Sequence, residues 1–234
     1  MTTYVLVHGG WHGGWCWRKV ATLLRAKGHE VFTPTMTGLG DRVHLAGPEV
    51  GLETHVQGII NVLFFEDLSD VVLVGHSYGG VVVTGVADRV PERIKRLVYL
   101  DAFIPADGQS VVDILAGAGI VGPNFNAAYV PVLPGNFGVT EPGDVAWLES
   151  HYTAHPGKTL VDKLQLTKPA GAHPFSHTYI WDAGNAGPIA SSVFQQTAER
   201  LRMDPAWRVH DLPTGHDVMV TMPNELTDIL LAIA

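Results

Sequence analysis

A serine between glycines directly follows an apolar run of the chain. Residues 71–74 are all valine or leucine, and residues 75–79 read Gly-His-Ser-Tyr-Gly. This G-x-S-x-G pattern is typical of a sharp strand-to-helix turn that raises the serine hydroxyl above a sheet, where it can attack a carbonyl carbon. The alternative is an ordinary turn in which Ser77 caps the following helix. Because small and β-branched residues of a helical segment follow the pattern, we interpret Ser77 as a nucleophile.

A serine hydroxyl is a weak nucleophile, so it needs a base. His216 ends the segment Pro-Thr-Gly-His at 213–216, just beyond the last predicted strand and near the end of the chain. A histidine there fits the order serine, acid, histidine. The chain has 12 histidines, so a histidine without a catalytic role is the alternative. Only His216 combines a loop after a strand with this place in the order, and we predict it as the base.

A second glycine-rich segment, His-Gly-Gly-Trp at 8–11, follows the first predicted strand. A loop there can turn one backbone N–H toward the serine, and the N–H of the residue after the serine supplies a second. We therefore predict an oxyanion hole formed by the amides of Gly10 and Tyr78. A flexible turn is the alternative. We expect His8 and His12 to support this loop, and His76 to pack within the serine turn.

Two aspartates compete for the role of the acid that orients His216. Asp101 closes the predicted strand next to that of the serine, and Asp182 follows the strand that comes two before the histidine loop. Either carboxylate could instead bond only to nearby backbone. The residue types alone leave both open.

Six short apolar or β-branched runs, separated by helical patterns, predict the fold. Strands without polar alternation are buried on both faces, and strands joined through helices pair in parallel. We predict an α/β fold with a six-stranded parallel sheet flanked by helices, in one domain of residues 1–234. Its core comprises 1–104 and 175–234, and a small helical cap comprises 105–174. The predicted strands are 4–8, 31–33, 71–74, 94–100, 177–181 and 207–210.

The formal net charge of -8 provides no basic field for phosphates, so nucleic acid and anionic membranes are poor partners. A small neutral molecule is the expected ligand, and a homodimer is possible. The single cysteine, Cys16, excludes an internal disulfide framework. The first residues have no basic segment before their short apolar run, so we expect a cytoplasmic protein.

Aromatic residues of the cap and of the first loop are the candidates for substrate contact. We name Trp11, Phe125, Tyr129 and Trp147, although packing of the cap onto the sheet is the alternative use of such residues. The histidines outside the motifs have no tight ligand spacing. We therefore expect no metal and no cofactor.

Three segments carry a resemblance to a known family. Residues 5–15 (VLVHGGWHGGW), 75–80 (GHSYGG) and 215–219 (GHDVM) resemble the α/β-hydrolase superfamily, in the small branch of plant methylesterases, hydroxynitrile lyases and EstC-like bacterial esterases. The resemblance implies cofactor-free hydrolysis of carboxylic esters through an acyl-enzyme, with Ser77 as nucleophile and His216 as base. The apolar cap favours small hydrophobic esters.

Two departures from the family pattern bear on these expectations. Asn185 stands where the plant enzymes place their acid, whereas Asp101 matches the position from which some haloalkane dehalogenases supply theirs, so we favour Asp101 over Asp182. The lyases carry a lysine after the histidine and a threonine in the first loop, where this chain has Asp217 and Gly9. A carbon–carbon lyase is thus disfavoured. It remains an alternative, as does a ligand-binding receptor on a hydrolase scaffold.

Overall fold

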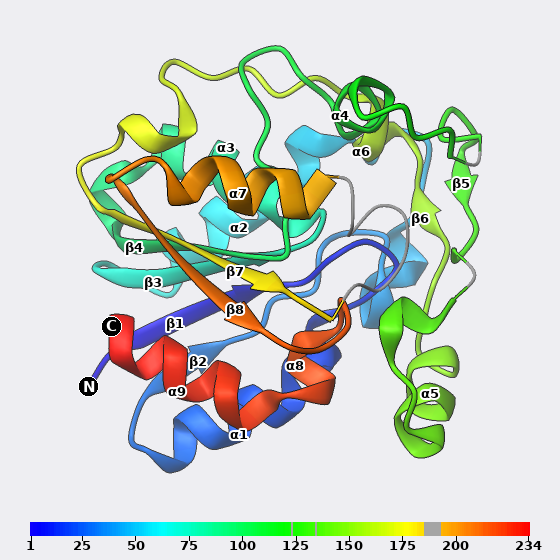
Figure 1. Cartoon of the computed structure of the whole chain (residues 1–234). Coiled ribbons are helices and arrows are strands. Elements are labelled where there is room, and N and C mark those ends of the chain that lie inside the picture. Colours follow the sequence, from blue (N-terminus) through cyan, green and yellow to red (C-terminus); the bar gives the residue numbers. More distant parts are fainter. Residues whose placement is uncertain (123, 134, 185–192) are drawn as a thin grey trace.

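The computed structural model describes residues 1–122, 124–133, 135–184 and 193–234. Its main sheet has six strands, all parallel, in the order β2-β1-β3-β4-β7-β8 (Figure 1). The predicted α/β fold with a six-stranded parallel sheet is therefore confirmed. The strands are β1 (Thr3–Val7), β2 (Glu30–Phe32), β3 (Val71–His76), β4 (Ile94–Leu100), β7 (Ser176–Asp182) and β8 (Trp207–Leu212).

Strand β3 lies in the middle of the sheet, and all six of its residues are buried. Its register places Gly75 beside Val7 of β1 and beside Tyr99 of β4. Leu100 of β4 in turn pairs with Ile180 of β7. The carboxyl ends of these strands therefore lie side by side, at the edge of a parallel sheet where ligands bind.

Helices cover both faces of the sheet, and a hydrophobic core lies under each layer. One core contains residues of the helices α2, α3 and α7, and the other contains residues of α1 and α9. The Tyr4 hydroxyl donates to the carbonyl oxygen of Leu230 at 3.2 Å, which fastens α9 to β1. These helices are α1 (Arg18–Ala26), α2 (Leu52–Phe65), α3 (Gly79–Arg89), α7 (Gln195–Arg202) and α9 (Pro223–Ile233).

Figure 1 shows the part of the segment 105–174 that runs from α4 (Val111–Gly117) to α6 (Lys158–Val161) at the end of the sheet away from the two chain termini, beside the carboxyl ends of the strands. Besides the expected helices, the segment contains a two-stranded antiparallel sheet, β5–β6. Two-residue strands are too short for an alternating pattern, so they could not be predicted from the sequence. The segment contains α4 (Val111–Gly117), β5 (Tyr129–Val130), α5 (Pro142–Glu149), β6 (His155–Pro156) and α6 (Lys158–Val161).

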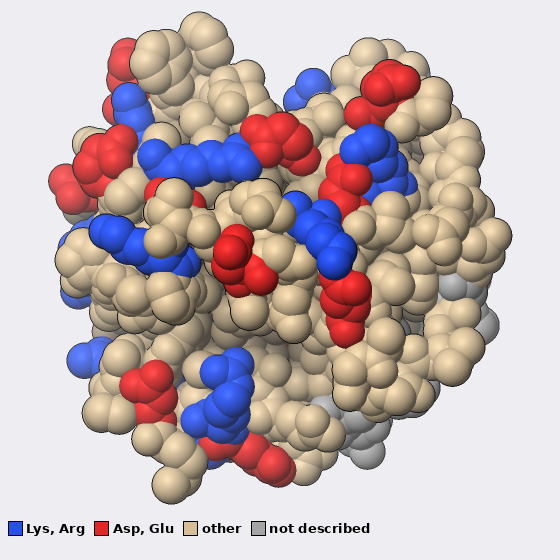
Figure 2. Space-filling model, turned by 90° about the horizontal axis from the view of Figure 1, so that it is seen from above, with Lys and Arg blue, Asp and Glu red and all other residues tan. Residues whose placement is uncertain are grey.

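The remaining short elements connect these layers. They are the helix α8 (Val218–Thr221) and the 3-10 helices η1 (Gly14–Trp17), η2 (Gly40–Leu45), η3 (Pro91–Arg93), η4 (Asn136–Gly138) and η5 (Ala170–Ala172). No helix in the described ranges has both the length and the apolar character needed to cross a membrane. On the face shown in Figure 2, basic and acidic side chains are intermixed.

Candidate active site

Ser77 lies at the turn between β3 and α3, in a backbone conformation that side chains rarely adopt. Its φ is +53°, in the left-handed region. The turn is fixed to the neighbouring strand, because the Ser77 N–H donates to the Leu100 carbonyl at 3.1 Å and the Ser77 carbonyl accepts from the Phe103 N–H at 3.2 Å. Such strain persists only where the surrounding structure enforces it, and it is common at functional sites.

The two glycines of the motif permit this close packing. A Cβ at Gly75 would lie 2.5 Å from Val83 Cγ2, and a Cβ at Gly79 would lie 2.6 Å from the His8 carbonyl oxygen. Any side chain at these positions would force the strand and the helix apart. The spacing G-x-S-x-G thus follows from the crossing of β3, α3 and the loop after β1.

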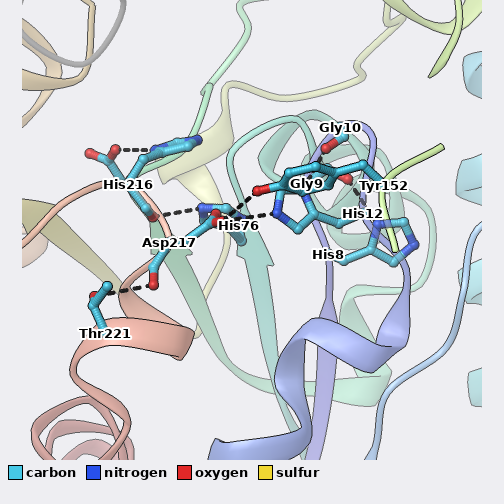
Figure 3. Close-up of polar contacts among 10 residues, drawn as sticks. His8, Gly9, Gly10, His12, His76, Tyr152, His216, Asp217 and Thr221 are labelled. Atoms are coloured by element: carbon cyan, nitrogen blue, oxygen red, sulfur yellow. Dashed lines mark hydrogen bonds and ion pairs between the residues drawn. The ribbon is translucent and has the colours of Figure 1, made fainter. Parts of the chain in front are cut away.

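His216 lies on the loop after β8 and is held from three sides. Its Nδ1 is 2.5 Å from Oδ2 of Asp101, and its carbonyl oxygen accepts a hydrogen bond from Nε2 of His76 at 3.0 Å (Figure 3). The ring of Phe194 stacks on the imidazole at a centroid distance of 5.4 Å. Burial lowers the pKa of His216 below 6.5, and nearby carboxylates offset part of that shift. A histidine that is neutral at pH 7 can act as a base.

Ser77 and His216 lie at the same edge of the sheet. Ser77 bonds to Leu100, whose neighbour Asp101 holds His216, and His76 bonds to the His216 backbone. Within the described chain, no hydrogen bond joins the Ser77 hydroxyl to the His216 ring. Ser77 is 9% exposed and His216 is 7% exposed, so both are largely buried. Catalytic hydrogen bonds are often long without substrate and tighten when it binds.

The structure distinguishes the two candidate acids by their contact with the imidazole. Asp101, at φ +42°, places Oδ2 on His216, and its N–H donates to the Ile180 carbonyl at 2.7 Å. Asp182 ends β7, is fully buried, and makes no hydrogen bond to another described residue through either carboxyl oxygen. Asn185, at the position of the plant acid, lies outside the described residues.

The predicted oxyanion loop packs directly against the serine. A Cβ at Gly9 would lie 2.9 Å from Ser77 Cβ, and one at Gly10 would lie 4.0 Å from Tyr78 Cβ. Hydrogen bonds within the described chain leave the amides of Gly10 and Tyr78 unused, whereas the Trp11 N–H donates to His155 Nδ1 at 3.2 Å. The two predicted amides are therefore available beside Ser77 for an oxyanion.

Buried histidines support this loop. His8 donates from Nδ1 to the Gly9 carbonyl at 2.8 Å and accepts from the Met36 N–H at Nε2 at 3.0 Å. Burial lowers the pKa of His8 to about 3, so this ring is neutral. His12 Nδ1 lies 2.6 Å from the Gly10 carbonyl oxygen. The supporting contacts expected for His8 and His12 are present.

Several residues near the site were not predicted to take part in it. The ring of Phe137 lies 5.9 Å from that of His216 and 5.5 Å from that of His12, and Phe194 stacks on His216. Tyr152 and His12 both bond to Asp217 (Figure 3). Asp217 directly follows His216 in sequence, and that proximity was the one available signal. The aromatic residues carried none.

The four residues predicted to contact substrate do not form one cluster. Trp11 is buried, and its indole N–H donates to the Val130 carbonyl at 3.1 Å. Phe125 is buried in the core that also contains Tyr78. Tyr129 is 43% exposed on β5, and Trp147 packs against Trp15 with a ring distance of 5.1 Å. Substrate contact by these side chains stays a prediction.

Known proteins resemble this chain over its whole length. The model of the α/β hydrolase family matches residues 4–229. A carbendazim hydrolyzing esterase of Nocardioides sp. (strain SG-4G) is 40% identical over 247 residues, covering 100% of each chain. A probable esterase of Oryza sativa subsp. indica, PIR7A, is 28% identical over 99% of this chain and 96% of its own.

A solved structure agrees with these relatives. An extracellular α/β-hydrolase from a Paenibacillus species, described as sharing structural and functional homology with tobacco salicylic acid binding protein 2, superposes with a TM-score of 0.80 at 26% identity, covering 100% of this chain and 99% of that one. The relatives support a hydrolase of the esterase type. The chain belongs to the α/β hydrolase family.

Proposed function

We propose that the protein is a serine esterase in which Ser77 is the nucleophile, His216 the base and Asp101 the acid. One observation carries this proposal. The strained Ser77 bonds through its N–H to Leu100, and the next residue, Asp101, bonds to Nδ1 of His216 at 2.5 Å. The turn that carries the Ser77 hydroxyl thus bonds to Leu100, and the imidazole of His216 bonds to Asp101. These two adjacent residues lie at the carboxyl end of β4.

The reaction begins when the Ser77 oxygen attacks the ester carbonyl carbon and Nε2 of His216 takes the hydroxyl proton. The amides of Gly10 and Tyr78 donate hydrogen bonds to the developing oxyanion. The C–O bond to the alcohol then breaks, and His216 gives its proton to the departing oxygen. In the second half of the reaction, water attacks the carbonyl carbon of the acyl-enzyme while His216 takes its proton. The bond to Ser77 then breaks, His216 returns the proton to the Ser77 oxygen, and the acid is released. Asp101 stabilises the imidazolium in both halves.

The substrates we propose are small esters with an aromatic or branched apolar part. Phe137 and Phe194 support this choice, because both place an aromatic ring within 6 Å of the His216 ring centroid. Apolar walls with few polar groups are typical of sites for such ligands. Carbendazim, named in the relative at 40% identity, belongs in the same assay panel.

Labelling with a fluorophosphonate tests the nucleophile directly. We expect one adduct, on Ser77, in folded protein, and loss of at least about 10⁴-fold in kcat/KM for Ser77→Ala. The exposed Ser150→Ala is the matched control and should keep both labelling and activity. A folded protein that takes no adduct on Ser77 would instead be a ligand receptor on a hydrolase scaffold.

A second assay separates ester hydrolysis from the lyase alternative. A chain-length series of nitrophenyl esters is measured beside mandelonitrile cleavage. We expect ester turnover to exceed cyanohydrin cleavage, since the position after the base carries the carboxylate of Asp217 and provides no cation for a departing cyanide. Faster cyanohydrin cleavage would overturn the esterase assignment.

A further inference from the structure

Asp101 and Asp182 form a buried carboxyl pair beside the imidazole of His216. Both aspartates are fully buried, and one ligand-type atom from each, with one from His216, lies within 4.8 Å of the others. The pairing of Leu100 with Ile180 explains this closeness, because both aspartates follow at the carboxyl ends of adjacent parallel strands. We call these two aspartates the carboxyl pair.

Among the described residues, three of the four oxygens of the carboxyl pair have no hydrogen-bond donor. Asp101 Oδ2 meets Nδ1 of His216, but Asp101 Oδ1 and both oxygens of Asp182 are buried without a partner. An unpartnered buried carboxylate oxygen is costly, and two ionised carboxylates at this separation repel strongly. Burial raises the pKa of both residues, and the charge of Asp101 raises that of Asp182 further. A proton between the two groups would relieve both costs.

We propose that Asp182 is a positioning residue that keeps a proton and donates a hydrogen bond to Oδ1 of Asp101, while Asp101 stays ionised and holds His216. The carboxyl pair then carries one negative charge in total. Asp101 accepts on both oxygens, from His216 at one and from Asp182 at the other. This role rests on the proposed function, because it assigns Asp182 to the same triad.

The surrounding groups place the proton on Asp182 and the charge on Asp101. In the part of the chain that the structure describes, Asp101 has an N–H donor at its carboxyl group, Nδ1 of His216, and Asp182 has none. The Tyr179 hydroxyl, the other titratable group of β7 near the pair, donates instead to the Ala102 carbonyl at 3.1 Å. Asp217 raises the pKa of His216, as a charge on Asp182 would, and His12 lowers it. Neither Asp217 nor His12 bonds to the carboxyl pair.

Substitutions at Asp182 test whether this residue acts as a hydrogen-bond donor or as a second carboxylate. Asp182→Leu removes the donor, and we expect kcat to fall by about 10- to 100-fold, the worth of one hydrogen bond to a charged group, with KM little changed. Asp182→Asn keeps an N–H donor in the same place and should restore kcat to within about five-fold of the wild type. Asp101→Asn should lose about 10⁴-fold.

The acid limb of the pH–rate profile distinguishes a protonated Asp182 from an ionised one. If Asp182 is protonated, Asp182→Asn changes no charge, and the apparent pKa of His216 stays where it is in the wild type. If Asp182 were the ionised acid, the same change would remove a negative charge and shift that limb to lower pH. Such a shift, or a loss in Asp182→Asn as large as in Asp101→Asn, would overturn the proposal.

An infrared measurement is independent of catalysis and of the Ser77 assignment. The wild type should show the band of a protonated carboxylic acid at pH 7, and Asp182→Asn should lack it. Absence of the band from folded wild-type protein contradicts the proton on Asp182, whatever the nucleophile is. Assays and spectra in EDTA should match those without it, since a divalent cation bound by Asp101, Asp182 and His216 would also abolish the band.

Discussion

His12 lies between the carboxylate of Asp217 and the backbone of the oxyanion loop, and it bonds to both. Its Nε2 is 3.1 Å from Asp217 Oδ2, and its Nδ1 is 2.6 Å from the Gly10 carbonyl oxygen (Figure 3). A carbonyl and an ionised carboxylate both accept, so the imidazolium form of His12, with hydrogen on both ring nitrogens, satisfies both contacts. Burial alone would lower its pKa, but the charge and hydrogen bonds of Asp217 leave it raised above 6.5.

We therefore predict that Asp217→Asn destabilises the fold and slows catalysis. Removing one partner of a buried ion pair leaves the other charge uncompensated, which costs about 3–5 kcal/mol. The His12 ring, which contacts the Gly10 carbonyl through Nδ1, is then held less firmly, so the proposed oxyanion amide is less well placed and kcat falls. Urea unfolding measures the first effect, and ester turnover measures the second.

Asp144→Asn is the matched control for this change. Asp144 pairs with Lys19 at 2.8 Å, but their side chains are 24% and 38% exposed. A surface pair contributes about 0–1 kcal/mol. Equal losses of stability in the two variants would contradict the buried ion pair of His12 and Asp217.

The pH dependence of ester turnover follows from the burial of His216. The base must be neutral to accept the Ser77 proton, and burial lowers its pKa below 6.5. Protonation therefore inactivates the enzyme only as the pH falls through that lowered value. We expect the acid limb of kcat/KM to have its midpoint below pH 6.5.

This midpoint is measured with p-nitrophenyl acetate from pH 4 to 9, and circular dichroism at each pH shows whether the protein stays folded. A midpoint at or above 6.5 would contradict the lowered pKa.

Much of the fold and the motif geometry could be predicted, because local patterns carry them. The apolar run at 71–74 predicts a strand buried on both faces, and the glycines around Ser77 predict the strained turn that the structure contains. The carboxyl pair illustrates what could not be predicted. The sequence offers Asp101 and Asp182 as alternative candidates for the acid that orients His216. Only the register of β4 with β7 shows that the two residues are neighbours.

The cap contacts could not be predicted for a different physical reason. Tyr152 and Phe137 reach His12 from more than 120 positions along the chain, through packing that no helical or strand periodicity encodes. The position of the cap on the core depends on individual contacts, such as the hydrogen bond from the Trp11 indole N–H to the Val130 carbonyl. Such contacts depend on the complete fold.

A side chain at Gly9 should impair catalysis more than folding. In Gly9→Ala, the new Cβ would lie 2.9 Å from both Ser77 Cβ and His76 Nδ1, so the serine or the loop must shift. A misplacement of about 1 Å can cost about 10²-fold in rate. We expect kcat/KM for nitrophenyl esters to fall by about that factor.

Gly58→Ala provides the control, because nothing lies within 4 Å of a Cβ at this position in α2. It should raise the free energy of unfolding by about 0.5–1 kcal/mol and leave turnover unchanged. If Gly9→Ala kept full activity, the loop would not pack on Ser77 as the structure has it.

Substitution of Phe137 should affect substrate affinity more than substitution of Tyr129, a cap residue that the sequence predicts to contact substrate. The Phe137 ring lies 5.9 Å from those of both His216 and Trp11, so it borders the candidate site, whereas Tyr129 is 43% exposed on β5. In Phe137→Ala, loss of an aromatic wall should raise KM for aryl esters by about 10-fold, the worth of roughly 1–2 kcal/mol of apolar contact. The effect should be smaller for ethyl acetate, which has no ring.

Tyr129→Ala should change KM less than two-fold for either substrate, which corresponds to under about 0.4 kcal/mol. If the Tyr129 variant showed the larger rise in KM, the apolar part of the substrate would lie toward β5 and away from the aromatic residues around His216.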